Sequence, residues 1–363
     1  MLYTFRNTNI FSMEYQLPNK ILTSLEIENR LAPIYDHFKL HSGRLELMTG
    51  IAERRIGEVG QLPSALAIST VNKLIERTHD IDKNFDYRNE IDLLIYASVC
   101  RDCLEPATAS KVHAALKLKD ECCFFDLSNA CLGIMNAILL AANLVETKQI
   151  KSALVVASEN SAPLIETTIN HLLSKFNSGE LKKSELKKHM ASFTIGSGAY
   201  AAIVTNSDRI QDNSNSNNLK PIKLLACSLL TNTKAQNLCT GGGHHHEMIM
   251  ETDSEALLHA GISLADRNWN NLKELLSWSN NSPTHFITHQ VGETHQRLLA
   301  KQLGIDIGKF YSTFKTLGNT GSVALPISWA QAHQDSLFKK NDQLALLGIG
   351  SGLSSIMFAV EYQ

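Results

Sequence analysis

The fold is indicated first by a phrase that occurs twice, in Ser192-Phe-Thr-Ile-Gly-Ser-Gly-Ala-Tyr-Ala-Ala-Ile-Val204 and in Leu346-Leu-Gly-Ile-Gly-Ser-Gly-Leu-Ser-Ser-Ile-Met-Phe-Ala-Val360. Each copy consists of Ile-Gly-Ser-Gly followed by an apolar run that is typical of a buried strand. Glycine-rich phrases recur by chance in turns, but each copy here also follows a strand, a loop and an apolar helix-like stretch. We therefore predict an α/β protein with two homologous halves.

A polar segment supplies the predicted boundary between the halves. The run Thr205-Asn-Ser-Asp-Arg-Ile-Gln-Asp-Asn-Ser-Asn-Ser-Asn-Asn218 is polar and low in complexity, as exposed connectors are. We assign residues 1–205 to an N-terminal half, 206–220 to the connector and 221–363 to a C-terminal half. Such halves would bring related helix N-termini face to face across a pseudo-twofold axis, so that distant residues can meet.

Cys131 is the candidate nucleophile. A strand-like run, Glu121–Asp126, ends shortly before it, and the stretch Cys131–Asn143 is too apolar around its circumference for a surface helix. We expect Cys131 to be the first residue of a buried helix, where free N–H groups and a partial positive charge stabilise a thiolate and an oxyanion. A plain buried cysteine is the alternative. Cys122 and Cys123 are expected to be buried strand residues.

Two further polar residues lie in similar strand-to-turn settings. His289 follows the short apolar run of Thr284–Gln290, and Asn319 lies in Thr316–Ala330, a glycine-punctuated loop that leads into a second apolar helix. Taken singly, such a histidine is more often a satisfied core residue and such an asparagine a turn residue. Together with Cys131 they supply a nucleophile and two hydrogen-bonding groups for a carbonyl oxygen, which acyl transfer through a thioester requires.

In this order and at these separations the segments resemble the ketoacyl-acyl-carrier-protein synthase III branch of the thiolase superfamily. The matching segments span nearly the whole chain and are Thr49-Gly-Ile-Ala-Glu-Arg-Arg55, Ser128-Asn-Ala-Cys-Leu-Gly133, His289-Gln290, Gly318-Asn-Thr-Gly-Ser322 and Gly348-Ile-Gly-Ser-Gly352. The resemblance implies the five-layered αβαβα thiolase fold, with Cys131, His289 and Asn319 as the catalytic set. It implies an oxyanion hole formed by the backbone N–H groups of Cys131 and Ser351. It also implies a homodimer that uses acyl-CoA substrates, with no bound cofactor and no metal.

Glu105 distinguishes between subgroups of this family. It lies in Cys103-Leu-Glu-Pro-Ala-Thr-Ala-Ser110, a proline-containing loop ahead of a helix, where a carboxylate can equally be a solvated charge. The Glu-Pro-x-Thr-Ala arrangement resembles the enzymes that join two acyl chains head to head in olefin and pyrone biosynthesis, where this glutamate acts as a base from the neighbouring subunit. A condensation without decarboxylation must remove an α-proton, whereas priming synthases decarboxylate malonyl-carrier protein instead.

Differences from the sequences of the priming synthases also favour the enzymes that join two acyl chains head to head. The tryptophan and arginine that hold the adenine of coenzyme A in those enzymes fall on Arg44 and Met48 here. The asparagine that they carry three residues after the histidine is Gly292. The adenine contacts of the priming synthases are therefore not carried over to this chain.

Three functions follow from these residues. The favoured one is a condensing enzyme in which Cys131 holds a first acyl chain, His289 and Asn319 bind the carbonyl of a second thioester, and Glu105 removes its α-proton. The second is a chain-priming synthase that uses acyl-CoA with malonyl-carrier protein, in which Glu105 is incidental. The third, of a different class, is a silent partner subunit of a heterodimeric condensing enzyme.

Composition narrows the class of protein. A chain of 363 residues with 44% hydrophobic content can bury one large core, and a net charge of −2 gives no electrostatic case for nucleic acid. No apolar run approaches the roughly 20 residues of a membrane span, and the N-terminus lacks a signal-peptide core, so we expect a cytosolic protein. Seven cysteines without Cys-x-x-Cys pairs fit reduced thiols better than disulfides or a zinc site.

Three other segments invite binding interpretations. Glu166–His189 has a lysine-rich helical pattern that we interpret as a solvated helix, with contact to an acidic carrier protein or to coenzyme A phosphates as the alternative. Gly241–His246 lacks the Lys-Ser/Thr of a phosphate loop, and its three consecutive histidines do not share one face of a helix or strand. We expect a mobile loop there, near the substrate entrance. Arg54 and Arg55 are expected to be ordinary surface residues.

Acylation of Cys131 tests the assignment of the nucleophile. An unperturbed cysteine has a pKa of about 8.5, and the helix N-terminus and a nearby imidazole are expected to lower it. Intact-mass analysis after exposure to acyl-CoA should show one acyl adduct that Cys131→Ser lacks. Adducts on Cys122 or Cys123, with Cys131 unmodified, would contradict the assignment.

Overall fold

The chain builds the same arrangement of five strands twice. The computed structural model describes residues 1–211, 222–242 and 248–363. The first set comprises β2 (Thr8–Gln16), β5 (Ile91–Tyr96), β6 (Cys123–Asp126), β7 (Ser152–Glu159) and β8 (Gly198–Asn206). The second comprises β9 (Ile222–Thr231), β12 (His285–Thr288), β13 (Phe310–Tyr311), β14 (Gln343–Gly350) and β15 (Ser354–Tyr362). The spatial orders, β6-β5-β7-β8-β2 and β13-β12-β14-β15-β9, are the same permutation of the chain order.

The two sets join through β2 and β9. Two residue pairs, Asn9 with Lys223 and Ile10 with Ile222, connect the sets antiparallel, and β1 (Leu2–Thr4) adds to β9 to complete an eleven-stranded sheet. Within the first set β5 runs parallel to β6 and β7, and within the second β12 runs parallel to β13 and β14. Parallel strands need helical crossovers, and these supply the helical layers.

Side-chain alternation along the strands separates the layers. On β5, Leu93 and Ile95 pack into the central core with α7 (Gly133–Glu146), whereas Leu94 and Tyr96 pack outward, against α4 (Pro63–Ile81) and α6 (Thr108–Leu116). The second set repeats this, with α14 (Ala324–Gln334) inside and with α11 (Ser254–Leu276) and α12 (Glu293–Leu303) outside.

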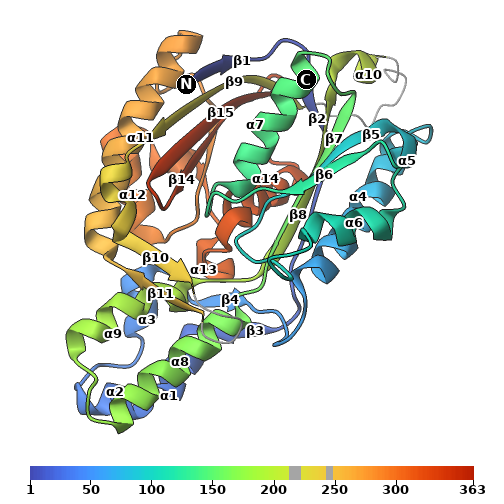
Figure 1. Ribbon diagram of the computed structural model, residues 1–363. Helices are drawn as coiled ribbons and strands as arrows, with labels where there is room; N and C mark the ends of the chain where they lie inside the picture. The colour runs from blue at the N-terminus through green and yellow to red at the C-terminus, as the bar shows by residue number, and fades with distance from the viewer. Residues whose placement is uncertain (212–221, 243–247) are drawn as a thin grey trace.

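Figure 1 shows the result: α7 and α14 lie in the middle, α4 and α6 cover one side, and α11 and α12 cover the other. A helix that is apolar on all sides must be covered on both faces, which explains why α7 and α14 form the central layer. The predicted five-layered fold of two related halves is confirmed.

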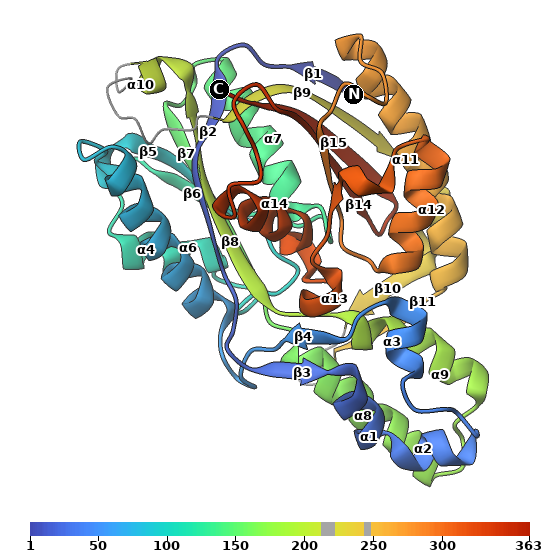
Figure 2. The ribbon, with the colours of Figure 1, turned by 180° about the vertical axis from the view of Figure 1, so that it is seen from behind.

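A cap of short elements lies at one end of the sheets (Figure 2). Its helices are α1 (Ser24–Arg30), α2 (Ala32–His37), α3 (Arg44–Thr49), α8 (Ala162–Asn177) and α9 (Lys183–His189), most of which share a separate apolar cluster. Two antiparallel strand pairs complete it, β3 (Ile21–Thr23) with β4 (Glu53–Arg55), and β10 (Cys239–Gly242) with β11 (Ile249–Thr252). The remaining helices are α5 (Tyr87–Glu90), α10 (Ser207–Gln211) and α13 (Phe314–Leu317).

The lysine-rich segment forms two helices, α8 and α9, and not one. Three of its five lysines have carboxylate partners: Lys175 pairs with Glu185, and Lys187 and Lys188 lie 3.6 and 3.7 Å from acidic residues of α11 and β11. This pattern agrees with solvated helices better than with a surface for phosphates.

The boundary between the halves stays a prediction. The connector begins with α10, and its residues 212–220 lie outside the described residues. His244–His246, which belong to the predicted mobile loop Gly241–His246, lie outside them as well. In the part of the chain that the structure describes, no helix is both long and apolar enough to span a membrane.

Three local predictions were wrong. The helix begins at Gly133 and not at Cys131, because the two preceding residues turn between β6 and α7. Cys122 is buried, but Cys123 is exposed because β6 is the edge strand of its sheet. Arg54 is fully buried, and its guanidinium donates to the carbonyl oxygen of Leu22 at 3.1 Å. Burial lowers the pKa of Arg54 to about 10.

Candidate active site

Equivalent loops of the two halves carry the candidate residues. Cys131 lies between β6 and α7, and Asn319 lies between β13 and α14, which are matching positions in the two sets of strands. Glu105 lies in the loop after β5, and His289 directly follows its counterpart β12. The carboxyl ends of parallel strands share one edge of a sheet, so each half contributes two adjacent loops. The expected pseudo-twofold relation between Cys131 and Asn319 is thus present in the topology.

The turn that carries Cys131 packs against the β14–β15 turn. Ala130, the residue before the cysteine, has a φ of +45°, which is uncommon for a residue with a side chain. The Leu132 side chain fills the space over two glycines of β14: a Cβ on Gly348 or Gly350 would lie 2.9 Å from it. Ser351 follows Gly350 directly, so the two segments expected to form the oxyanion hole are neighbours.

A close backbone approach fixes the start of α7. A Cβ on Gly133 would lie 2.9 Å from the carbonyl oxygen of Ala97, which follows β5. Only glycine allows this contact without a shift. The helix N-terminus that follows Cys131 is therefore held directly against the end of β5.

The thiol of Cys131 is not activated by its surroundings. Burial raises its pKa to about 12, and the negative charge of Glu159 and the nearby thiol of Cys239 act in the same direction. The expected lowering by the helix N-terminus was wrong for this state of the protein, because the loss of solvation outweighs the partial charge of a helix that begins two residues later. Cys131 is a neutral thiol at physiological pH.

His289 is a neutral imidazole. Its backbone N–H donates to the carbonyl oxygen of Leu347 on β14 at 3.1 Å, and its side chain is 4% exposed. Burial, followed by the neighbouring His295, lowers its pKa to about 3. Nδ1 is buried and has no hydrogen-bond partner among the described residues. A neutral ring carries one proton, and the tautomer that has it on Nε2 presents an N–H donor at the outer end of the ring.

Asn319 is held so that its amide nitrogen is the available end. Its backbone N–H donates to Thr194 O at 2.8 Å, and its carbonyl oxygen accepts from Gly196 N–H at 2.9 Å. The side-chain oxygen Oδ1 accepts from Gly321 N–H at 3.1 Å. Because Oδ1 is used within the loop, the amide group can act as a donor to a substrate oxygen.

Glu159, at the end of β7, was missed by sequence reasoning. Its carboxylate is 4% exposed and accepts hydrogen bonds from Val99 N–H at 2.9 Å, Cys100 N–H at 3.0 Å, and the N–H and hydroxyl of Ser322 at 3.2 and 2.5 Å. It therefore ties the loop after β5 to the loop that carries Asn319. A single acidic residue at the end of a buried strand gives no signal that distinguishes this role.

Glu105 is separate from this cluster within the chain. It is exposed, as is Leu104 at 87%. The loop is anchored on both sides: Asp102 accepts from Ser64 and Lys111, and Asp126 accepts from the first two N–H groups of α6. Between these anchors Leu104 and Glu105 project into solvent, away from the same subunit's core.

A Cβ cannot be accommodated where the priming synthases have asparagine. Gly292 has a φ of +149°, and a Cβ there would lie 2.5 Å from the carbonyl oxygen of Thr49. Arg44 is exposed on α3 and Met48 is 45% exposed. The two residues that replace the adenine contacts of the priming synthases are thus at the surface, and Gly292 lies at a tight backbone contact.

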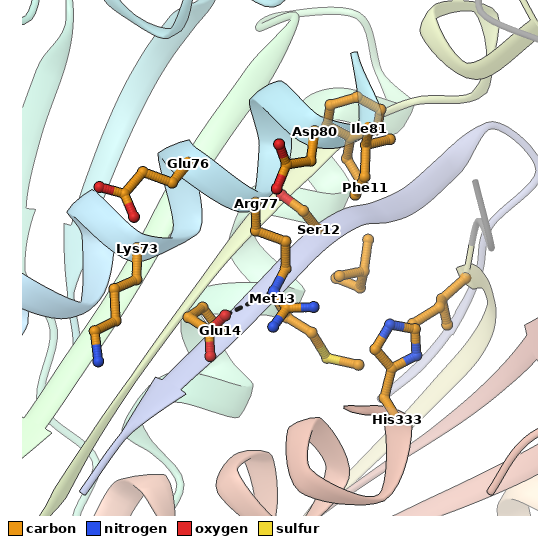
Figure 3. Close-up of a pocket in the computed structure, with 12 residues that line it drawn as sticks. Phe11, Ser12, Met13, Glu14, Lys73, Glu76, Arg77, Asp80, Ile81 and His333 are labelled. Carbon is orange, nitrogen blue, oxygen red and sulfur yellow. Dashed lines mark hydrogen bonds and ion pairs between the residues drawn. The ribbon is translucent and has the colours of Figure 1, made fainter. Parts of the chain in front are cut away.

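A cavity of about 520 Å³ lies elsewhere, between β2, α4 and α14 (Figure 3). Its lining includes Lys73, Glu76 and the ion pair of Arg77 with Glu14 at 2.6 Å, and it contains none of the candidate catalytic residues. Its charged walls do not suit an acyl chain. We therefore assign the active site from the converging loops and not from this cavity.

Comparison with protein families gives two matches. Residues 125–219 match the 3-oxoacyl-[acyl-carrier-protein (ACP)] synthase III model, and residues 274–362 match the model of the C-terminal region of the same enzymes. The chain is 35% identical to a Shewanella oneidensis protein named acyl-CoA:acyl-CoA alkyltransferase, over 97% of this chain and 98% of that one. It is 24% identical to a Clostridium botulinum β-ketoacyl-[acyl-carrier-protein] synthase III, over 96% of both chains.

Solved structures agree. A variant of Xanthomonas campestris OleA superposes with a TM-score of 0.89 at 32% identity, covering 99% of this chain and 98% of that one. Another variant of the same protein, solved with bound lauric acid and lauroyl-CoA, superposes with a TM-score of 0.88 at 32% identity, covering 98% of this chain and 99% of that one.

The neutral state of Cys131 predicts a steep pH dependence of its alkylation. With a pKa of about 12, the rate with iodoacetamide should rise about tenfold per unit between about pH 6 and 9, because the thiolate fraction does. Peptide mass spectrometry measures this, with the exposed Cys123 as internal reference. A rate that is high and independent of pH over this range would indicate a thiolate–imidazolium pair and contradict the neutral state.

Replacement of Glu159 should affect both stability and the nucleophile. Glu159→Gln places an amide N–H group against at least one backbone donor, which should cost roughly 1–3 kcal/mol in denaturant unfolding. Removing the negative charge should lower the pKa of Cys131 and so speed its alkylation at a fixed pH. Product formation should fall because the loop that carries Asn319 loses hydrogen bonds between Ser322 and the carboxylate of residue 159.

Glu146→Gln is the matched control. Glu146 accepts from Arg6 N–H, Asn7 N–H and the Thr8 hydroxyl at the far end of α7. The Glu146→Gln variant should lose stability in the same way, but the alkylation rate of Cys131 should not change. Equal effects of both variants on Cys131 would assign Glu159 a purely structural role.

Proposed function

The chain belongs to the 3-oxoacyl-[acyl-carrier-protein] synthase III family, and on this premise we propose that it is an acyltransferase that condenses two acyl-CoA molecules head to head. The observation that carries the proposal is Glu105, which projects into solvent apart from the set of Cys131, His289 and Asn319 in its own chain. The Shewanella oneidensis relative, which is 35% identical to this chain, is named an acyl-CoA:acyl-CoA alkyltransferase. The product would be a β-keto acyl thioester.

In the first half-reaction Cys131 accepts the first acyl chain. The sulfur attacks the thioester carbonyl, the backbone N–H groups of Cys131 and Ser351 stabilise the oxyanion, and coenzyme A leaves as a thiol. Because Cys131 starts as a neutral thiol, its proton must be transferred during this step, and the departing coenzyme A sulfur takes up one proton. The acyl transfer is therefore balanced without an external acid or base.

In the second half-reaction His289 and Asn319 bind the carbonyl oxygen of a second acyl-CoA. A neutral imidazole with Nε2–H and an amide N–H are both donors, and together they stabilise the enolate that forms when the α-proton leaves. The α-carbon then attacks the Cys131 thioester, and the thiol is regenerated. The sequence is a ping-pong reaction in which no bound cofactor takes part.

Glu105 is the proposed base for the α-proton, acting from a second subunit. Its exposure in this chain supports that arrangement, because a carboxylate that projects into solvent is accessible to a neighbouring subunit. Among the solved Xanthomonas campestris variants, the substituted glutamate precedes the substituted cysteine by the same number of residues as Glu105 precedes Cys131.

A homodimer through the β6 edge fits these observations. Among the described residues β6 pairs only with β5, and it carries the exposed Cys123 and Phe124, the latter 41% exposed. An unpaired edge strand with an aromatic side chain favours pairing with a second strand. The turn of Cys131 follows β6 in sequence, and Asp126 at the end of β6 accepts hydrogen bonds from Thr108 and Ala109, which follow the loop of Glu105. We further propose a cytosolic enzyme, with acyl carrier protein as an alternative acyl donor.

Product analysis with a Glu105 variant tests the proposed function. Wild-type protein with a long-chain acyl-CoA alone should form a β-keto product, whereas Glu105→Gln should form almost none while Cys131 is still acylated, because only the base is removed. Mass spectrometry measures both. Full activity of Glu105→Gln with acetyl-CoA and malonyl-carrier protein, and no product from acyl-CoA alone with wild type, would assign a priming synthase instead. Absence of acylation in every mixture would assign a silent subunit.

Mixed dimers test whether the base acts across the interface. A mixture of Glu105→Gln and Cys131→Ser subunits should regain part of the activity, because one site of each mixed dimer then has both groups. The matched control is each variant alone, treated in the same way, which should stay inactive because both of its sites lack the same group. No recovery, together with dimers of both variants, would mean that Glu105 serves its own subunit or none.

A further inference from the structure

Helices α8 and α9 lie in the cap below the sheets (Figures 1 and 2), and two pairs of their side chains contact each other. On α8, His171 and Lys175 are four residues apart, and on α9, Glu185 and His189 are four residues apart. This spacing places each pair on one face of its helix. Lys175 Nζ forms an ion pair with Glu185 Oε1, and the rings of His171 and His189 have centroids 5.4 Å apart.

Metal-ligating atoms converge at this place. One nitrogen of His171, one nitrogen of His189 and one carboxylate oxygen of Glu185 all lie within 4.8 Å of one another. Tetrahedral ligands at about 2.1 Å from a zinc ion are roughly 3.4 Å apart. Side-chain adjustments of roughly 1 Å would therefore complete a three-ligand site without backbone movement.

His189 is prepared as a ligand by its second ring nitrogen. The side chain is 1% exposed, and Nδ1 lies 3.2 Å from the carbonyl oxygen of Met250 on β11. A carbonyl oxygen only accepts, so Nδ1 carries the proton and donates it. Nε2 is buried and has no hydrogen-bond partner among the described residues, and in the neutral ring it is a free lone pair. A histidine whose Nδ1–H donates to a carbonyl oxygen while Nε2 is free has the arrangement found around metal ions.

His171 favours its unprotonated form more than an ordinary histidine does. Burial lowers its pKa, and the neighbouring His189 and Lys175 lower it further. A metal ion binds the unprotonated ring, so this direction favours binding. The Glu185 pKa is lowered, mainly by its hydrogen bond from Lys175, so the carboxylate is ionised and available.

We propose that His171, Glu185 and His189 bind one divalent transition-metal ion of the zinc type. Two imidazoles and one carboxylate select such ions over Ca²⁺ and Mg²⁺, which require oxygen ligands. The fourth position is open to water. The bound ion takes the place of the Lys175 ammonium group as the counter-charge of Glu185, so metal and Lys175 compete for one carboxylate.

This inference departs from the expectation that the chain binds no metal. The ligands come from two helices, and the sequence contains only the Glu-x-x-x-His of α9 as a trace of the site. Its position suggests a structural role: β11, which holds Met250, pairs with β10, and β10 begins with Cys239, whose thiol acts on the pKa of Cys131. The ion would brace α8 and α9 against the hairpin that borders the nucleophile.

Metal titration of full-length protein tests the proposal. His244, His245 and His246 are first replaced by alanine, because a run of histidines can itself bind such ions. Co²⁺ absorption and Zn²⁺ calorimetry should then report one equivalent of metal, and the melting temperature should rise on addition of Zn²⁺. In this background His171→Gln and His189→Gln should each weaken Zn²⁺ binding at least about 100-fold, since loss of even an outer partner of a ligand costs about 10- to 100-fold.

Two further variants make the result specific. Lys175→Met should tighten Zn²⁺ binding, because Glu185 loses its competing cation, whereas Glu185→Gln should weaken it. The exposed His259→Gln on α11 should leave affinity unchanged. Glu185 is only partly buried, so Glu185→Gln keeps the test valid if a histidine variant fails to fold. Absence of Zn²⁺ binding in the background protein would overturn the proposal. So would Zn²⁺ affinities of the His171, Glu185 and His189 variants that equal the affinity of the background protein.

Discussion

The structure depends on the burial of two apolar helices between two sheets. α7 and α14 are apolar on every side, so each needs cover on both faces, and the strands of both halves provide it. Since each helix follows the third strand of its set, this burial brings the turns of Cys131 and Asn319 to the same region. The central layer therefore builds the core and the site at once, and its close contact at Gly133 leaves little freedom in either.

The same burial sets the protonation of the reactive groups. It raises the pKa of Cys131 to about 12 and lowers that of His289 to about 3, so thiol and imidazole are both neutral. In a water-poor site, charge is costly until substrate arrives, whereas fixed N–H donors are effective when an oxyanion or enolate forms. The geometry suits a reaction in which charge develops on the substrate and not on the resting protein.

Two glutamates have opposite environments and complementary proposed roles. Glu159 is buried and saturated with hydrogen bonds, and it joins the loop after β5 to the Asn319 loop. Glu105 projects from a loop that Asp102 and Asp126 anchor at both ends. An exposed carboxylate on an anchored loop, with no partner among the described residues, is suited to complete the site of a second copy.

The sequence by itself determined the α/β class, the two related halves, the order of the catalytic segments and the loops in which Cys131, His289 and Asn319 lie. It could do so because glycine turns, apolar periodicity and strand-to-turn positions are local properties. Tertiary structure decided the rest: that Cys123 is exposed on an edge strand, that Arg54 is buried, that Glu159 ties two loops together, and that burial outweighs the helix N-terminus in setting the pKa of Cys131. Each of these depends on which distant segments pack together, and solvation and hydrogen-bond partners are set by that packing and not by neighbours in the chain.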